Sequence, residues 1–310
     1  MIDIALMLEG QNGLNWAFWQ RFAHAAEDLG FAGLYRSDHF TNSQPPDLDS
    51  LELWVSLTWL ASHTRRIQFG PLVSPVSFRH PAITARMAAA VDDLSGGRLW
   101  LGLGAGWMER EHTNFGLDLL EIDERFARFE EALEVVTRLL HSDAPVSFQG
   151  RYYRLHDAIL LPRPQRPGGP PILIGGSGRR RTLPLVARFA SEWNAVYITA
   201  EKFAKLNAHL DELLRAQGRQ PSEVRRSLMT GCVYGRDRAE QERRALAWTD
   251  GQDSLEDLRR NGILVGDAAE ISDQIAALEA AGVQRVMLQW LDLDDLAGLE
   301  TLARGIIRNT

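Results

Sequence analysis

Cysteine is almost absent from this sequence. Cys232 is the single cysteine among 310 residues, so the chain can form neither an internal disulfide nor a metal cluster held by several thiolates. We interpret Cys232 as a small buried residue in a strand, because lone cysteines usually behave as small apolar residues. The histidines are scattered over predicted helices and loops, so we expect no metal site.

Long apolar runs and an excess of positive charge are absent too. No stretch approaches the roughly 20 apolar residues of a membrane-spanning helix. The first residues, MIDIALMLEG, carry Asp3 and Glu9 instead of the basic start of a signal peptide. Lys and Arg number 34 against 41 Asp and Glu, a net charge of -7 at pH 7, whereas nucleic-acid binders usually carry an extended basic surface. We expect a cytoplasmic protein without membrane or nucleic-acid partners.

What the sequence does contain is a regular alternation of short apolar strands and helical patterns. We expect strands at residues 2–8, 31–35, 67–73, 99–103, 172–174, 193–198, 226–234 and 286–289. Eight strands, each followed by a helix, are the number in an α/β fold of the (β/α)8 TIM-barrel type. A doubly wound open sheet shows the same alternation and is the alternative.

The chain is 45% hydrophobic, enough for one large core, and we expect residues 1–310 to form a single domain. Residues 146–161 depart from the alternation and predict an inserted hairpin on one rim. The predicted buried faces of two helices include Leu51, Trp54, Val55, Thr58 and Leu60 on the first and Ile83, Met87, Val91 and Leu94 on the second.

In a TIM barrel the functional residues lie on the loops that follow the strands. The loop after the fourth strand is rich in glycine: Gly102, Gly104 and Gly106 remove side chains at every second position. A flat ligand could lie on this bare backbone, but tight packing explains such a turn equally well. A dinucleotide-binding loop fits worse, because its third glycine would fall at Trp107 or Glu109. The loops selected in this way are residues 9–11, 36–39, 73–79, 104–112 and 175–181.

The loop Gly175, Gly176, Ser177, Gly178 has the composition of a phosphate site. Small residues let backbone N–H groups converge at a helix start, and Ser177 adds a hydroxyl. The lysine of a nucleotide-triphosphate loop is absent. Residues 179–181 are all arginine, and cations at a helix start cost a few tenths of a kcal/mol each unless an anion binds there. The alternative is that these arginines are solvated and the glycines only form a turn.

Two histidines follow predicted strands. His39, beside Asp38, can donate a hydrogen bond to a ligand or transfer a proton, although a histidine of this kind is more often a satisfied polar residue. His112 lies on the helix after the glycine-rich loop, where its ring can face either the pocket or solvent.

Four segments together resemble the luciferase-like monooxygenase superfamily: LYRSDHF, LVSPVSFRHP, SGGRLWLGLGAGWMEREHTNFG and PILIGGSGRRRTLPLVARFASEWN. They are most similar to the branch of oxidoreductases that use the deazaflavin coenzyme F420. The resemblance runs in register from the first strand to about the seventh. It implies a (β/α)8 barrel with insertions, usually dimeric, that holds a flavin or deazaflavin at the carboxyl ends of its strands.

The resemblance also implies roles for particular residues. It implies a non-prolyl cis peptide between Val73 and Ser74. Some deazaflavin-dependent relatives carry an acid directly after the glycine matching Gly106, where this chain has Trp107, so His39 becomes the first candidate for a general acid or base and Glu9 the second. The implied cofactor-binding residues are His39, Val73, Ser74, Gly104, Ala105, Gly106 and His112 around the ring, and Gly175, Gly176, Ser177 and Gly178 at the phosphate.

We therefore predict an enzyme, a homodimer, that transfers a hydride between coenzyme F420 and a small organic substrate. One alternative is a monooxygenase in which C4a of reduced flavin mononucleotide (FMN) reacts with oxygen. Residues 179–181 favour F420, because a longer acidic cofactor tail would use these arginines better. A second alternative is a flavin-binding barrel without catalytic activity.

Overall fold

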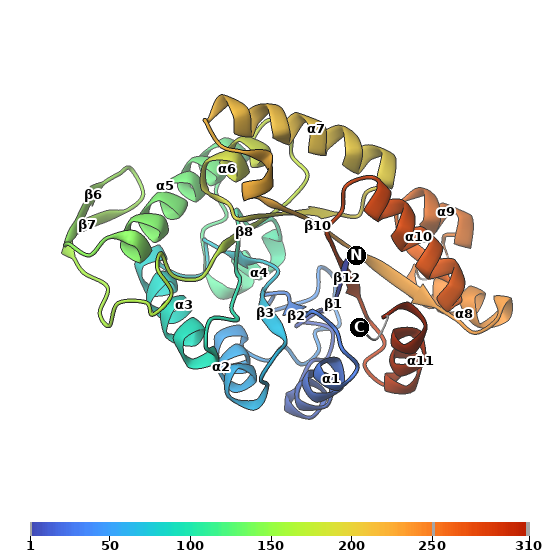
Figure 1. Ribbon diagram of the computed structural model, residues 1–310. Helices are drawn as coiled ribbons and strands as arrows, with labels where there is room; N and C mark the ends of the chain where they lie inside the picture. Colours follow the sequence, from blue (N-terminus) through green and yellow to red (C-terminus); the bar gives the residue numbers. More distant parts are fainter. Residues whose placement is uncertain (1, 250–251, 308–310) are drawn as a thin grey trace.

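The computed structural model describes residues 2–249 and 252–307. Its central strands are β1 (Asp3–Leu8), β2 (Gly33–Arg36), β3 (Gln68–Pro71), β4 (Ser74–Pro75), β5 (Leu101–Gly104), β8 (Ile172–Gly175), β9 (Glu192–Val196), β10 (Arg225–Tyr234), β11 (Leu264–Gly266) and β12 (Arg285–Gln289). Nine of them pair in parallel in the order β3-β2-β1-β12-β10-β9-β8-β5-β4, and β11 pairs in parallel with β10 off this path. Phe69 of β3 pairs with Leu99, just before β5, so the two edges of the sheet meet. The predicted TIM barrel is confirmed (Figure 1).

Helices form the outer layer around the strands (Figure 1). They are α1 (Trp16–Asp28), α2 (Leu53–His63), α3 (Pro81–Ser95), α4 (Glu109–Phe115), α5 (Ile122–His141), α6 (Thr182–Phe189), α7 (Ala200–Ala216), α8 (Arg238–Trp248), α9 (Leu255–Arg260), α10 (Ala268–Ala280) and α11 (Leu296–Ile306), with a 3-10 turn at Pro221–Glu223. Local sequence sets several of their ends. Asp267 and Glu270 form a capping box at the start of α10, and Gly96 ends α3 in the left-handed conformation.

Two departures from the simple alternation lie on the rim. The predicted hairpin is present as β6 (Val146–Gln149) and β7 (Arg154–Ala158), an antiparallel pair beside α5. The Glu131 carboxylate of α5 accepts hydrogen bonds from the backbone N–H groups of Arg151 and Tyr152, which hold the hairpin turn. Strand β11, which pairs with β10, is not among the strands predicted from the sequence, because its apolar run of three residues is too short to stand out.

The predicted burial of α2 and α3 is partly wrong. The exposed fractions of Val55, Ile83 and Leu94 are 56%, 52% and 52%, and Thr58 is exposed as well. Helix α3 instead buries its small residues, including Ala85, Ala88 and Ala89. Small side chains allow this helix to lie close to its neighbours, so its larger apolar residues are left on the outside.

The inside of the barrel is plugged at the amino ends of the strands by a buried polar cluster. The fully buried guanidinium of Arg285 donates to Tyr35 Oη at 2.6 Å and to Glu192 Oε2 at 3.0 Å. Met7, Met229 and Met287 pack in the same interior. The barrel is therefore a packed core rather than a channel, and its open end is the carboxyl end of the strands. Within residues 2–249 and 252–307, every helix is too short or too polar to span a bilayer.

Candidate active site

The loops selected from the sequence meet at the carboxyl ends of the strands, where hydrogen bonds join them. Ser37 Oγ accepts a hydrogen bond from the backbone N–H of Gly10 at 2.8 Å, which joins the loops after β1 and β2. Ser74 Oγ donates to Asp38 Oδ2 at 2.7 Å, which joins the loops after β2 and β3. We call this end of the barrel the mouth.

The predicted third strand is interrupted at the mouth. Residues 68–75 form β3 and β4, with a cis peptide bond between Leu72 and Val73 at the break. The prediction that the cis bond precedes Ser74 is wrong by one residue. By Ser74 the chain has already resumed parallel pairing with Leu103 of β5, and the hydroxyl of Ser74 is bound to Asp38, so the break in the strand lies before Ser74.

Glycines of the neighbouring strands make room for this break. A methyl group on Gly104 would lie 2.6 Å from Val73 Cγ2, and one on Gly175 would lie 3.0 Å from Val73 Cγ1. A methyl group on Gly102 would lie 1.9 Å from the Pro71 carbonyl oxygen. Close packing against β3 and Val73 thus accounts for these three glycines, while a ligand contact at Gly104 or Gly175 stays a prediction. Gly106 differs, since its φ of +85° is in the left-handed region.

His39 is held by a buried carboxylate that the sequence analysis missed. Glu111, on α4 and fully buried, lies with Oε1 2.9 Å and Oε2 3.1 Å from His39 Nδ1, and its Oε2 also accepts the N–H of Phe40 at 3.0 Å. A carboxylate only accepts hydrogen bonds, so Nδ1 carries a proton and Nε2 is the atom left for a ligand. Burial disfavours the imidazolium form, but the bond to Glu111 and the charges of Glu111, Glu9 and Asp38 outweigh it and raise the pKa of His39.

Glu9 lies in a different part of the mouth network from the His39–Glu111 pair. Its carboxylate accepts hydrogen bonds from the side-chain amides of Gln11, at 3.1 Å, and of Gln289. Gln289 in turn accepts a hydrogen bond from the hydroxyl of Tyr197. Tyr197 directly follows β9 and has a φ of +46°, a strained backbone conformation for a bulky residue. These bonds form a polar arc that joins the ends of β9, β12 and β1.

Both ring nitrogens of His112 are hydrogen-bonded to protein atoms. Nδ1 lies 2.7 Å from the Met108 carbonyl oxygen and Nε2 lies 2.8 Å from Ser77 Oγ, and the residue is buried. Its ring therefore fastens α4 to the loop after β4. A cofactor contact for His112 stays a prediction.

The candidate phosphate loop follows β8. The N–H of Gly176 donates to the Asn194 carbonyl at 2.8 Å, and Ser177 Oγ accepts the N–H of Val196 at 3.2 Å. Among the described residues, none accepts the hydroxyl proton of Ser177. Arg181 is paired with Asp123 on α5. In the described part of the chain, Arg179 and Arg180 are exposed and make no ion pair, so two positive charges remain at this loop.

Two cavities adjoin the mouth. One, of about 580 Å³, is lined by residues including Tyr197, Lys202 and Trp248. The other, of about 440 Å³, is lined by residues including Trp248, Trp290 and Cys232. Cys232 is buried in β10, as predicted, and burial raises the pKa of its thiol to about 12, so the unreactive thiol form prevails.

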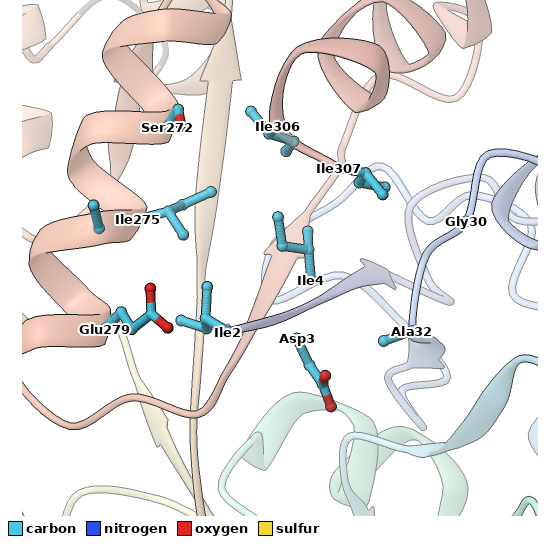
Figure 2. Close-up of a pocket in the computed structure, with 11 residues that line it drawn as sticks. Ile2, Asp3, Ile4, Gly30, Ala32, Ser272, Ile275, Glu279, Ile306 and Ile307 are labelled. Atoms are coloured by element: carbon cyan, nitrogen blue, oxygen red, sulfur yellow. The ribbon is translucent and has the colours of Figure 1, made fainter. Parts of the chain in front are cut away.

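A further hollow lies at the opposite end of the barrel. Figure 2 shows Ile4 of β1 and Ile2, which precedes β1, facing Ile275 of α10 and Ile306 of α11. These residues line a cavity of about 290 Å³. In TIM-barrel enzymes the reacting groups lie at the other end of the barrel, at the carboxyl ends of the strands. Over the described residues, no group of three or more His, Cys, Asp or Glu side chains is arranged to hold a metal ion.

A closed parallel barrel with its polar side chains gathered at the carboxyl ends of the strands has the layout of a TIM-barrel enzyme. The chain belongs to the luciferase-like monooxygenase family, whose model matches residues 4–259. The resemblance noted in the sequence is thereby confirmed.

Curated relatives and a solved structure extend this result. An F420-dependent glucose-6-phosphate dehydrogenase of Kineococcus radiotolerans is 34% identical over 226 residues, 71% of this chain and 64% of that protein. A 4-hydroxyprotoasukamycin monooxygenase of Streptomyces nodosus subsp. asukaensis is 28% identical over 87% of this chain and 79% of its own length. An F420-dependent secondary alcohol dehydrogenase, solved with an F420-acetone adduct, superimposes with a TM-score of 0.88 at 19% identity and covers 99% of both chains, which shows the shared fold. The chain spans about 64% of the length of the dehydrogenase it matches.

Proposed function

We propose that this protein is a deazaflavin-dependent oxidoreductase that moves a hydride between coenzyme F420 and an organic substrate. The observation that carries the proposal is the His39–Glu111 pair, which leaves Nε2 of the imidazole for a ligand at the mouth. The F420-dependent names of relatives at 33% to 34% identity support this choice of cofactor. When bound, the deazaflavin supplies the hydride acceptor or donor, and the protein supplies position and proton transfer.

The residues of the mouth fit such a cofactor. Ser177 keeps a free hydroxyl proton, and Arg179 and Arg180 provide charge for a phosphate and an acidic tail. Val73 is held at the break by the glycines around it, so its position under a flat ring would be fixed. We propose that the ring is held by His39, Val73, Ser74, Gly104, Ala105 and Gly106, with His112 in support, and the phosphate by Gly175, Gly176, Ser177 and Gly178.

We propose that His39 exchanges a proton with the substrate oxygen through Nε2. Glu111 holds the other nitrogen and keeps the ring oriented, so Glu111 is a positioning residue. Its negative charge also favours the imidazolium, which suits a proton donor. Glu9 is the second candidate, but its carboxylate is already bound by two amides.

Cofactor binding by the ligand-free protein tests the proposal. Equilibrium ultrafiltration with F420 and with FMN should show tighter binding of F420. The double substitution Arg179→Ala and Arg180→Ala should weaken F420 binding about tenfold, because each exposed ion pair contributes up to about 1 kcal/mol. Arg188→Ala is the matched control, since Arg188 lies on α6 and is paired with Glu130. Tighter binding of FMN than of F420 would contradict the proposal.

The second candidate is an FMN-dependent monooxygenase. The match to a named monooxygenase over 87% of this chain favours it. It predicts the opposite order of affinities in the same ultrafiltration experiment, together with oxygen consumption when reduced FMN is supplied. A cofactor-binding barrel without activity predicts binding of either cofactor and no turnover.

We also propose that the protein is a dimer that buries the outer faces of α2 and α3. Val55, Ile83 and Leu94 are large apolar residues, each more than half exposed, on two helices that pack together. Trp16 and Trp59 extend this apolar surface onto α1, with ring centroids 6.4 Å apart. Such a patch is typical of an interface. We further propose that residues 1–310 form a single domain. We also propose a cytoplasmic location, which suits a protein with one buried thiol.

A further inference from the structure

The wall of the mouth beside His39 is aromatic. Trp107 is 63% exposed, and its indole meets the His39 ring edge-on with the centroids 5.5 Å apart. Phe40, the residue after His39, stacks on Phe78 at 4.3 Å and contacts Phe115 at 4.9 Å. An indole with most of its surface outside the core contributes little to packing. Its area is available to a ligand, and aromatic side chains are favoured anchors for apolar groups.

The same wall carries negative charge, and its arginines are already bound to protein oxygens. Glu111, Glu9 and Asp38 all favour the protonated form of His39, so the local potential is negative. The arginines near this wall in the described chain already bind protein oxygens, among them Arg125, which donates to the carbonyl oxygens of Leu120 and of Gly106, the residue before Trp107. Arg36 donates to Ser56 Oγ at 2.8 Å and to the Leu51 carbonyl, Arg79 is bound to Asp38 and Glu52, and Arg110 is bound to Asp47. An anionic group placed at this wall would be repelled by these carboxylates and would have to displace an existing hydrogen bond to gain an arginine as partner.

We propose that the substrate is an uncharged, apolar secondary alcohol or the corresponding ketone, whose carbon skeleton lies on Trp107 and whose oxygen lies on His39 Nε2. This inference rests on the proposed F420-dependent activity. In the oxidation, the carbinol C–H bond breaks and its hydride passes to the oxidised deazaflavin, while the hydroxyl proton passes to neutral His39 and a ketone remains. In the reduction, the reduced deazaflavin returns the hydride to the carbonyl carbon and the His39 imidazolium protonates the oxygen.

Lys202 is a possible binding partner for a different class of substrate, one that carries a phosphate. Among the described residues that line the two mouth cavities, Lys202 is the cation without an ion pair, since Arg260 is bound to Asp257 and Arg244 to Asp295. A phosphorylated substrate would need Lys202, whereas an apolar alcohol would need Trp107. Substitutions at Trp107 and at Lys202 therefore distinguish an apolar from a phosphorylated substrate.

The experiment compares 1-phenylethanol with glucose 6-phosphate as reductants of F420. The wild-type protein should show a kcat/KM for 1-phenylethanol at least about tenfold higher, and Trp107→Ala should lower it about tenfold, mainly through KM, because an aromatic contact and its buried area are lost. Trp107→Phe should retain most of the activity, and Lys202→Gln should change it little. A higher kcat/KM for glucose 6-phosphate, or a loss with Lys202→Gln in place of Trp107→Ala, would overturn the proposal.

A second measurement does not depend on turnover. In protein labelled with 5-fluorotryptophan and loaded with F420, acetophenone should shift the ¹⁹F resonance that Trp107→Phe removes, and leave unshifted the resonance that Trp16→Phe removes. An unshifted Trp107 resonance at saturating acetophenone would overturn the proposal. Failure of F420 to bind at all refutes the proposed function, whereas F420 binding with preferred oxidation of glucose 6-phosphate refutes only the substrate class.

Discussion

His39 and Glu111 are 72 positions apart in the sequence, yet they form the central pair of the site. His39 was selected because it follows a predicted strand at the functional end of the barrel. No spacing rule connects it with a glutamate on a later helix. Glu111 is found only when β2 and α4 are placed side by side by the fold.

Glu111→Gln should lower the pKa of His39 in the ligand-free protein. The pKa is raised in the folded state, so the stabilisation from the imidazolium is fully present below the ordinary histidine value of about 6.5 and is lost as the pH rises through the higher folded value. Titration of the His39 ring by ¹H-¹⁵N NMR measures the shift directly.

Glu109→Gln is the matched control, since Glu109 is exposed on the same helix and should leave the titration unchanged. If His39 titrates alike in wild type and Glu111→Gln while both remain folded by circular dichroism, Glu111 does not position His39 electrostatically.

His39→Gln should abolish most of the turnover and weaken F420 binding only a few-fold, because the other residues proposed to hold the ring and the phosphate remain. Loss of a general acid or base typically costs about 10² to 10⁴ in rate. F420 binding by ultrafiltration and kcat with 1-phenylethanol are the paired measurements. Turnover within a few-fold of wild type would exclude His39 as the proton-transferring group.

At the scale of elements, the break between β3 and β4 and the glycines next to it form one packing unit. From the sequence, residues 67–73 are predicted to form one strand, Gly104 to lie under a flat ligand and Gly175 to belong to a phosphate site. The side chain of Val73 occupies the space that a Cβ atom on Gly104 or Gly175 would need. This packing explains both the break in the strand and the glycines beside it. The pattern of glycines was visible in the sequence, but the partner that fills their space was not.

Gly104→Ala should destabilise the protein by about 1–3 kcal/mol, because its new methyl group would overlap Val73 Cγ2 in a packed core. Urea unfolding followed by circular dichroism gives the free energy of unfolding. Adding Val73→Ala removes the obstructing methyl groups and should recover part of the loss, so additive effects of the two substitutions would contradict the assigned contact.

At the scale of the whole molecule, the barrel interior depends on a buried ion pair. Glu192→Gln would leave Arg285 without its buried carboxylate, and breaking such a pair by removing one partner typically costs about 3–5 kcal/mol. Thermal and urea unfolding should show this loss. Glu201→Gln, which breaks the exposed pair with Lys205, should have no measurable effect. Equal stabilities of the two variants would refute the structural role of the pair.

The apolar outer faces of α2 and α3 predict the oligomeric state. Light scattering coupled to gel filtration should show a dimer, and the double substitution Ile83→Lys and Leu94→Lys should convert it to a monomer, since two buried charges per subunit would face each other. Leu246→Lys on α8 is the control, because Leu246 is 52% exposed at a distant element. A monomeric wild-type protein would refute the proposed interface.

The sequence by itself determined the alternation of strands and helices, the hairpin and the loops that form the mouth. These follow from local patterns, because strand and helix periods and capping residues act over a few positions. Closure of the sheet, by contrast, is seen in the pairing of Phe69 with Leu99. Only the tertiary structure decided the partner of His39, the position of the cis bond, the function of the glycines around Val73 and the outward faces of α2 and α3. Each of these depends on which distant segments touch, and a period in the sequence shows that a face is apolar without showing what covers it.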